Sequence, residues 1–276
     1  MKTTQLANGF AVEIEGVDLA QPLDETAFDQ IKSLWMENRV AVFRNQTLDD
    51  DALVAFAERF GPLFVHAQSS LLSSRRKEVM ELSNLENAER AVTHELDWHT
   101  DQSYTPQPVF GTILHGLVAP KEGGETHFSD LAGAYATLPE ELHARIKGAT
   151  AIYSAEPRPK AREKPLNAEE RARIHDCVHP IVRTHPYLMR KAIYLSPLHI
   201  RTIGDLPEPD SLSLMAELIE HAVQPAHIYQ HKWSVGDVVM WDNTSIMHRR
   251  TPFPSHERRH LKRTGFYLPN DLATPI

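Results

Sequence analysis

The sequence has 276 residues, 41% of them hydrophobic, and a formal net charge of −8. This length is enough for one large domain or two small ones with a substantial core, and the negative charge disfavours a nucleic-acid partner bound through its phosphates. A single cysteine, Cys177, no apolar signal stretch near the N-terminus and no run of about 18 apolar residues together predict a cytoplasmic protein without a disulfide or a membrane span.

The first sixty residues predict two helices with a strand between them. Asp24 is suited to cap the first helix, whose apolar residues have the three-and-four spacing of a buried face. Those apolar residues are Phe28, Ile31, Leu34 and Trp35. Residues 40–43 are predicted to form a short buried strand. The second helix is expected to end at Gly61-Pro62. Its apolar residues are Leu53, Phe56, Ala57 and Phe60.

Two further helices and several short strands are predicted later in the chain. Pro139 begins a helix that runs through Leu142 and Ile146, since proline is tolerated in the first helical turn. The apolar face of the next helix is Leu212, Met215, Leu218, Ile219 and Ala222. The predicted strands are residues 227–233, residues 238–241 after a turn at Gly236-Asp237, and residues 265–268.

Short strands separated by turns, with a few helices, predict a mainly β fold with flanking helices (α+β), either a β-sandwich or a jelly roll, the double-stranded β-helix. The absence of a glycine-rich strand–turn–helix segment argues against a dinucleotide or nucleoside-triphosphate site. We expect residues 1–276 to form a single domain with two candidate lid segments, 66–97 and 157–173. The second is rich in Arg, Lys and Glu, which fits either a solvated loop leading into a short helix or a mobile lid over a site.

One histidine–carboxylate triplet and a distant histidine form a candidate metal site. His99 and Asp101 are separated by one residue, so both side chains face the same side if the segment is extended. His248 would complete two imidazoles and one carboxylate, the ligand set of non-haem Fe(II) oxygenases, which leaves several coordination positions open. Catalytic zinc takes the same ligands. The ligand set alone therefore leaves iron and zinc both open, and a surface ion pair remains the alternative for the triplet.

Most of the sixteen histidines are not expected to bind metal. His94, His115 and His127 compete with the candidate ligands, and His115 is interpreted as a sheet histidine. The histidines interpreted as surface or loop residues are His185, His199, His221, His227 and His256.

Three residues form a candidate anion site. Thr126 follows the turn Gly123-Gly124-Glu125, and Arg259 and Arg263 are four residues apart, so that both would face one side of a strand. A guanidinium binds a carboxylate with two parallel hydrogen bonds, and a hydroxyl adds a third. One arginine is suited to hold a keto-acid cosubstrate and the other an anionic group of the substrate. A site for a keto acid favours iron over zinc as the metal. The alternative interpretation of residues 258–263 is a basic strand on the surface.

The chain resembles the taurine dioxygenase and 2,4-dichlorophenoxyacetate dioxygenase family of Fe(II)/2-oxoglutarate enzymes over nearly its whole length. The runs that carry the resemblance are Val40–Arg44, Phe60–Leu63, Trp98–Asp101, Gly123–Thr126, His179–His185, Gly236-Asp237, Trp241–Asn243, His248-Arg249 and the Arg259/Arg263 pair.

The resemblance implies roles for individual residues. The implied iron ligands are His99, Asp101 and His248. Thr126 and Arg259 would hold the distal carboxylate of 2-oxoglutarate, and Arg263 would lie near an acidic group of the substrate. His66 occupies the position of a sulfonate-binding histidine in the taurine enzyme. Glu95 and Asp97 stand where that enzyme has an amide side chain near the substrate amine, which argues against taurine itself.

We therefore expect a dioxygenase that uses Fe(II), 2-oxoglutarate and O₂, releases succinate and CO₂, and hydroxylates a small anionic organic substrate. An aryloxyalkanoate-type carboxylate is favoured, and sulfonates or amino-acid derivatives are the alternatives. Hydroxylation beside a heteroatom would cleave a C–O or C–S bond. We also expect a homo-oligomer with no nucleic-acid or membrane partner. Two rivals come from other classes. A zinc hydrolase would use the same three ligands but would need no site for a keto acid, and a non-catalytic jelly-roll binding protein would not need an intact ligand set.

Overall fold

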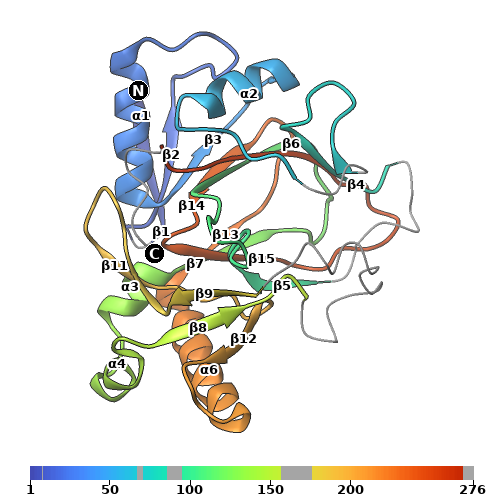
Figure 1. Cartoon of the computed structure of the whole chain (residues 1–276). Helices are drawn as coiled ribbons and strands as arrows, with labels where there is room; N and C mark the ends of the chain where they lie inside the picture. Colours follow the sequence, from blue (N-terminus) through green and yellow to red (C-terminus); the bar gives the residue numbers. More distant parts are fainter. Residues whose placement is uncertain (8, 67–70, 86–94, 157–175, 270–276) are drawn as a thin grey trace.

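Two β-sheets face each other in the computed structural model, which describes residues 1–7, 9–66, 71–85, 95–156 and 176–269 (Figure 1). The larger sheet has the order β1-β2-β3-β14-β6-β16-β4 and the smaller one β13-β7-β15-β5. The larger sheet consists of β1 (Lys2–Ala7), β2 (Ala11–Glu15), β3 (Val40–Phe43), β4 (Met80–Ser83), β6 (Gly111–Val118), β14 (Val238–Asp242) and β16 (His260–Phe266). The smaller sheet consists of β5 (Leu96–His99), β7 (Thr126–Asp130), β13 (Ile228–His231) and β15 (Ile246–Arg250). The predicted jelly roll with flanking helices is confirmed.

An apolar core lies between the two sheets. Phe128 of β7 packs against Trp241 of β14, with ring centroids 5.3 Å apart. Leu114, Val239 and Ile246 join the same buried cluster. Burial of these inward-facing side chains holds the sheets together and leaves the alternate residues of each strand to face outward.

Two helices cover the outer face of the larger sheet (Figure 1). They are α1 (Glu25–Asn38) and α2 (Asp50–Glu58). Asp24 caps α1 as predicted, because its carboxylate accepts the N–H of Ala27 at 2.7 Å. The predicted end of α2 is late by two residues: Phe60 follows the helix, yet it is buried and stacks on Phe266 at 5.1 Å. Its apolar character therefore reports burial rather than helical structure.

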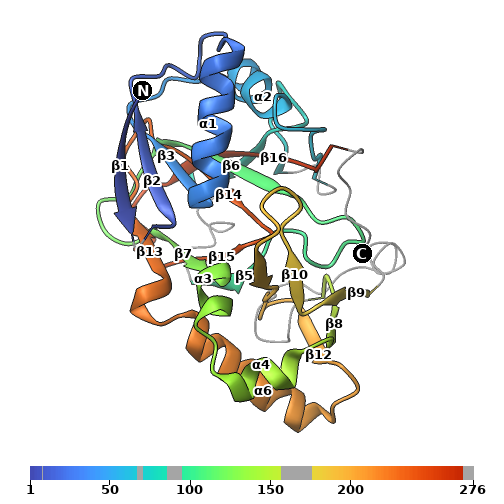
Figure 2. The same cartoon turned by 90° about the vertical axis from the view of Figure 1, so that its left-hand side faces the viewer.

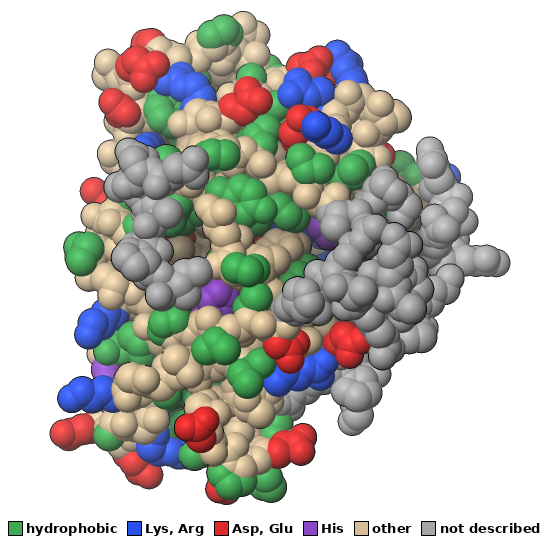
Figure 3. Space-filling view, viewed as in Figure 1, with side chains coloured by type: hydrophobic (Ala, Val, Ile, Leu, Met, Phe, Trp, Pro, Cys, Tyr) green, Lys and Arg blue, Asp and Glu red, His purple; other side chains and the backbone are tan. Residues whose placement is uncertain are grey.

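Three helices and two small sheets form the opposite layer (Figure 2). The helices are α3 (Leu131–Ala136), α4 (Glu140–Ile146) and α6 (Glu208–Ala222). The strands are β8 (Thr150–Tyr153), β9 (Cys177–Pro180), β10 (Val182–Thr184), β11 (Lys191–Ile193) and β12 (Ile200–Ile203), and η3 (Pro225–His227) precedes β13. The predicted helices after Pro139 and over residues 212–222 are confirmed. On the face shown in Figure 3, most charged side chains gather at the two helical ends of the molecule.

The last strand begins earlier than predicted, at His260 instead of Gly265, and ends at Phe266. Two charged residues made the start of this strand look like a surface segment in the sequence. Lys262 is ion-paired with Asp50, and Arg263 with Asp101. Because each charge has a partner, the strand can hold half-buried cations that a sequence pattern assigns to a surface segment.

The two lid candidates are only partly described. Residues 157–173 lie outside the described residues. Within 66–97, β4 is an edge strand that pairs antiparallel with β16, and residues 67–70 and 86–94 lie outside the described residues. None of the helices in the described ranges combines the length and the hydropathy needed to cross a membrane.

Candidate active site

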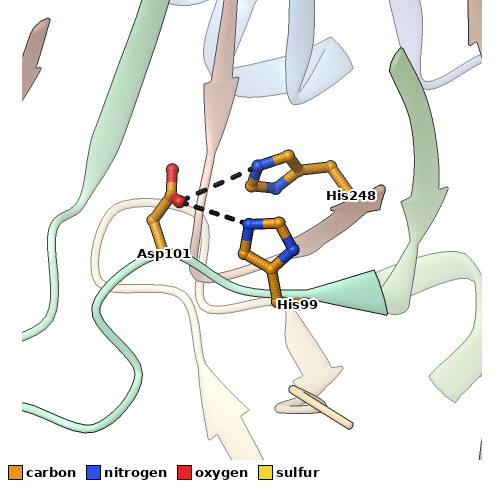
Figure 4. A group of neighbouring side chains, drawn as sticks. All are labelled: His99, Asp101 and His248. Atoms are coloured by element: carbon orange, nitrogen blue, oxygen red, sulfur yellow. Dashed lines mark ion pairs between the residues drawn. The ribbon is translucent and has the colours of Figure 1, made fainter. Parts of the chain in front are cut away.

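Three predicted side chains converge between the sheets (Figure 4). One ligand atom from each of His99, Asp101 and His248 lies within 4.8 Å of the others, and all three residues are buried. Asp101 Oδ1 is 3.8 Å from Nε2 of His99 and 3.8 Å from Nε2 of His248. The two imidazoles and one carboxylate thus point at one common place, as the sequence predicted.

Strand pairing creates this convergence. His99 ends β5 and His248 lies directly opposite it on the antiparallel strand β15. Asp101 is not in a strand, contrary to the extended segment assumed from the sequence, because β5 ends at His99 and a turn follows. Thr100 anchors that turn, since its hydroxyl donates to Leu195 O at 2.8 Å. Gln102 then has a positive φ of 53°, a conformation that reverses the chain just after the carboxylate.

Neighbouring groups orient the candidate ligands. His99 Nδ1 lies 2.8 Å from the carbonyl oxygen of Asp97. Because a carbonyl only accepts, Nδ1 carries the proton and Nε2 presents its lone pair to the site. Asp101 Oδ2 accepts from Thr112 at 2.8 Å and from Arg263 at 2.9 Å, which leaves Oδ1 facing the imidazoles. The His248 ring is held 4.6 Å from the Trp241 ring.

The electrostatics keep these residues in the protonation states that bind metal. Burial alone would raise the pKa of Asp101, but the positive charge of Arg263 and the contacts with His248, His99 and Thr112 hold that pKa well below its usual range. Burial lowers the pKa of His99 and His248. The carboxylate is therefore ionised and both imidazoles are neutral near pH 7, so a divalent cation does not have to displace a proton.

Two of the three residues predicted for an anion site, Thr126 and Arg259, lie at the turn Gly123–Thr126, whereas Arg263 pairs with Asp101. Thr126 begins β7 and accepts the indole N–H of Trp233 at 3.0 Å. Arg259 is 5% exposed, and its Nε donates to Gly124 O at 3.3 Å. Among the described residues, Arg259 makes no ion pair with a carboxylate, and its pKa is lowered by burial and by Arg250 with no described acidic group opposing them. A buried guanidinium without an anion is costly, so this arrangement fits the distal carboxylate of 2-oxoglutarate.

The glycine turn before Thr126 is required by this geometry. Gly123 has a φ of +70°, and a Cβ there would lie 2.2 Å from the carbonyl oxygen of Pro252. Gly124 has a φ of +69°, and a Cβ there would lie 2.8 Å from the Pro120 side chain, with the Arg259 side chain at 3.4 Å. The turn therefore lets the backbone come close enough for its carbonyl to hold the guanidinium.

A second arginine beside this site was missed in the sequence. Arg250 lies on β15, two residues after His248 and therefore on the same face, and it pairs in register with Thr126. Burial, and then the positive charge of Arg250, lower the pKa of Arg259 to about 9. The two-residue spacing from His248 was the signal that would have identified Arg250.

The predicted substrate residues have different surroundings. Arg263 lies within the metal group, because its guanidinium contacts Asp101, and its side chain is 16% exposed. His66 is half-buried and packs edge-on against Phe64. It is not a member of the group of described candidate ligands. Glu95 pairs with Arg249 at 2.9 Å, and Arg249 faces the side of β15 opposite to His248.

Four histidines interpreted as surface or loop residues are buried. Two of them, His185 and His199, do lie in loops, whereas His221 lies in α6 and His227 in η3. His221 and His227 both contact the hydroxyl of Thr137, at 3.2 and 3.1 Å. Polar neighbours in the sequence suggested exposure, but an imidazole can be buried at small cost when it is hydrogen-bonded. His256 is exposed as predicted, and none of these five belongs to the described metal group.

The other competing histidines are accounted for as far as the structure describes them. His115 is buried in β6, as expected of a sheet histidine, and its Nε2 lies 3.4 Å from Gln46 O. His127 contacts Arg249 at 3.2 Å on the outer side of the smaller sheet. His94 lies outside the described residues.

We expect the protein to lose stability in mild acid because of the buried His179. Burial, and then the charge of Arg183, lower its pKa from 6.5 to about 4. Between these values the unfolded chain binds more protons than the folded one, so the free energy of unfolding falls as the pH falls, by about 1.4 kcal/mol per pH unit for this one group. Chemical denaturation at pH 7 and pH 5 should show a smaller loss for His179→Gln than for the unmodified chain. Equal losses would mean that His179 is not held neutral in the fold.

The fold and the site together define a class of protein. A jelly roll with two imidazoles, one carboxylate and a buried guanidinium that has no carboxylate partner among the described residues fits Fe(II) and 2-oxoglutarate, because the ligand set leaves positions open and the arginine matches a carboxylate. This is the class of Fe(II)- and 2-oxoglutarate-dependent dioxygenases.

Comparison with known proteins identifies the family. The family described as taurine catabolism dioxygenase TauD, TfdA family matches residues 2–264. The chain is 32% identical to an alpha-ketoglutarate-dependent 2,4-dichlorophenoxyacetate dioxygenase of Cupriavidus pinatubonensis, over 92% of this chain and 93% of the relative. It is 31% identical to an (S)-phenoxypropionate/alpha-ketoglutarate-dioxygenase of Sphingobium herbicidovorans, over 91% and 89%.

A solved structure agrees with this assignment. The crystal structure of AAD-2 in complex with Mn(II) and N-oxalylglycine is 30% identical, covers 96% of each chain and has a TM-score of 0.84. The chain belongs to the TauD/TfdA family. It is an oxidoreductase, a dioxygenase dependent on Fe(II) and 2-oxoglutarate.

Proposed function

We propose that this dioxygenase hydroxylates a small anionic substrate of the aryloxyalkanoate carboxylate type. In this proposal His99, Asp101 and His248 hold Fe(II), and Thr126 and Arg259 hold the distal carboxylate of 2-oxoglutarate. The observation that carries the proposal is the position of Arg263, whose guanidinium lies 2.9 Å from the Asp101 carboxylate within the metal group. The two relatives named for phenoxyalkanoates support the substrate class.

The chemistry of the cofactors sets the task of the protein. When bound, Fe(II) and 2-oxoglutarate supply the oxidation: O₂ and 2-oxoglutarate give succinate and CO₂, and the second oxygen atom converts a substrate C–H into C–OH. The protein binds the substrate with this C–H bond toward the metal ligands and excludes water. For an aryloxyalkanoate the hydroxylated carbon carries the ether oxygen, so the product collapses to a phenol and a carbonyl compound.

Arg263 has the donors that this role requires. A guanidinium carries five N–H donors in one plane, and the contact with Asp101 leaves others for a second carboxylate. The guanidinium is therefore suited to bridge the metal ligand and the acidic group of the substrate. Such a bridge would place the substrate's α carbon near the metal ligands.

A sulfonate is the second candidate substrate. It is supported by the description of the family, which names taurine catabolism, because taurine is a sulfonate. A guanidinium donates to the oxygens of a sulfonate as well as to those of a carboxylate, and His66 would act as a second donor in this case. Assembly as a homo-oligomer is part of the same proposal.

The substrate class is tested by succinate release from the Fe(II)-loaded enzyme. We expect aryloxyacetates to stimulate succinate and phenol release together, and the matched neutral aryloxyacetamides to stimulate neither. Arylsulfonates and alkylsulfonates form the comparison series. Turnover of the neutral amide at the rate of the acid would overturn the anionic-substrate proposal, whereas preference for sulfonates would select the second candidate.

Arg263→Ala is expected to weaken substrate binding at least tenfold more than 2-oxoglutarate binding, which corresponds to about 1.4 kcal/mol of difference. The variant removes the charge-assisted bonds to the substrate, whereas Thr126 and Arg259 remain to bind 2-oxoglutarate. Two anaerobic titrations of the Fe(II) enzyme, with cosubstrate and then with substrate, measure the two affinities. Equal losses for both ligands would move Arg263 into the 2-oxoglutarate site. Arg263→Lys serves as control, because it keeps the positive charge beside Asp101.

A further inference from the structure

A continuous chain of buried hydrogen bonds ends on the candidate ligand Asp101. The indole Nε1 of Trp241 donates to Asn243 Oδ1 at 3.0 Å. Asn243 Nδ2 donates to Thr112 Oγ1 at 2.9 Å, and Thr112 Oγ1 donates to Asp101 Oδ2 at 2.8 Å. Every member is at most 3% exposed. These bonds are therefore shielded from competition with bulk water.

The direction of each bond is fixed by the chemistry of the donors. An indole N–H can only donate, so the oxygen of the Asn243 amide must face Trp241 and its NH₂ group must face Thr112. That NH₂ group can only donate, so it occupies the Thr112 oxygen as an acceptor. The single proton of the Thr112 hydroxyl is thereby directed at the ionised carboxylate of Asp101. No other orientation satisfies all three links.

The larger sheet supplies this chain. Trp241 on β14 and Thr112 on β6 pair in register, and the backbone N–H of Asn243 donates to Phe110 O at 2.8 Å. Asp101, by contrast, follows β5 of the smaller sheet. Asp101 lies in a turn rather than in a strand. The hydrogen bonds therefore connect its carboxylate to the paired strands β6 and β14 of the opposite sheet.

We propose that Trp241, Asn243 and Thr112 are positioning residues that hold Asp101 as a one-oxygen metal ligand. Thr112 and Arg263 both donate to Oδ2, so this oxygen is occupied on the protein side, while Oδ1 faces the two imidazoles. A carboxylate that offered both oxygens would use an additional coordination position. The arrangement therefore preserves the open positions that 2-oxoglutarate and O₂ require.

This inference rests on the proposed metal ligands but not on the substrate class. Its test is calorimetric titration of the full-length apoprotein with Mn(II), which reports metal affinity without turnover. Thr112→Val has nearly the same shape but lacks the donor, and it should bind Mn(II) roughly 10- to 100-fold more weakly. Thr112→Ser keeps the hydroxyl and should restore affinity close to that of the unmodified chain.

A matched control lies on the neighbouring strand. Thr264 on β16 is also buried, and its hydroxyl has no described hydrogen-bond partner. Thr264→Val makes the same chemical change without altering the hydrogen bonds that lead to Asp101. Its Mn(II) affinity should be unchanged. Thermal unfolding of each apoprotein shows whether a variant is folded, so that a loss of affinity is not mistaken for unfolding.

Residues further from Asp101 in this series of hydrogen bonds should have smaller effects on Mn(II) affinity. Trp241→Phe removes the donor furthest from Asp101 and keeps an aromatic ring beside His248, so its loss of Mn(II) affinity should be smaller than that of Thr112→Val. Unchanged affinity in folded Thr112→Val, or no rescue by Thr112→Ser, would overturn the positioning role while leaving the proposed function intact. Failure of the unmodified chain to bind Mn(II) would instead overturn the metal site, and the positioning role with it.

Discussion

Asp101→Ala is expected to reduce 2-oxoglutarate-dependent turnover at least about a thousandfold, which is ~4 kcal/mol of transition-state stabilisation. The variant removes the only carboxylate in the group of described candidate ligands, and neutral imidazoles alone bind a hard divalent cation less well. His99→Ala and His248→Ala should have effects of the same size. The measurement is O₂ consumption with 2-oxoglutarate and added Fe(II). Retained activity in Asp101→Ala would remove Asp101 from the metal site.

Loss of activity must be separated from loss of the fold. Asp101→Ala also removes the partner of the Arg263 guanidinium, which destabilises a half-buried charge. Asp101→Asn keeps the size of the side chain and an oxygen for the Thr112 hydroxyl, so it should stay folded and still lose turnover. His115→Gln is the matched control, because His115 is a buried histidine of β6 outside the metal group. It should retain activity.

Arg259→Gln is expected to raise the Michaelis constant for 2-oxoglutarate at least tenfold. The two charge-assisted bonds of a guanidinium to a carboxylate are worth about 1.5–3 kcal/mol, which corresponds to roughly 10- to 150-fold in affinity. Initial rates at varied 2-oxoglutarate concentration measure the change. The turnover number should fall less than the affinity, because Arg259 binds the end of 2-oxoglutarate that does not react.

The neighbouring arginine provides the control for this variant. Arg258 is exposed, so Arg258→Gln should leave the Michaelis constant unchanged. If Arg259→Gln also leaves it unchanged, Arg250 becomes the arginine that holds the distal carboxylate. Its place opposite Thr126 in the strand register makes it the alternative within the same site.

The sequence predicted the local elements well because their signals are local. The apolar spacing in α1 and the capping carboxylate of Asp24 lie within one helix, and both are confirmed. The turn at Gly236-Asp237 and the strand after it are also local, and β14 follows at Val238. The His99/Asp101 spacing brought two candidate ligands together for the same reason, although a turn rather than an extended strand places Asp101.

Long-range pairing was not predictable in the same way. Nothing near Thr112 in the sequence indicates that its hydroxyl meets Asp101, because the contact depends on how β6 lies against the turn after β5. The start of β16 was missed because Lys262 and Arg263 read as surface cations until their partners are known. Arg259 precedes that strand rather than lying in it. Its predicted closeness to the turn before Thr126 nevertheless appears in the structure, through the bond to Gly124.

In the proposed active site, His99, Asp101 and His248 hold an Fe(II) ion, and 2-oxoglutarate then binds beside it. The most direct test of this assignment is an anaerobic absorption titration of the Fe(II)-loaded protein with 2-oxoglutarate, carried out on the unmodified chain and on His248→Ala. We expect a visible charge-transfer band that saturates at one 2-oxoglutarate per chain in the unmodified protein and is absent in the variant. No band in the unmodified protein, or the same band in His248→Ala, would contradict the assignment.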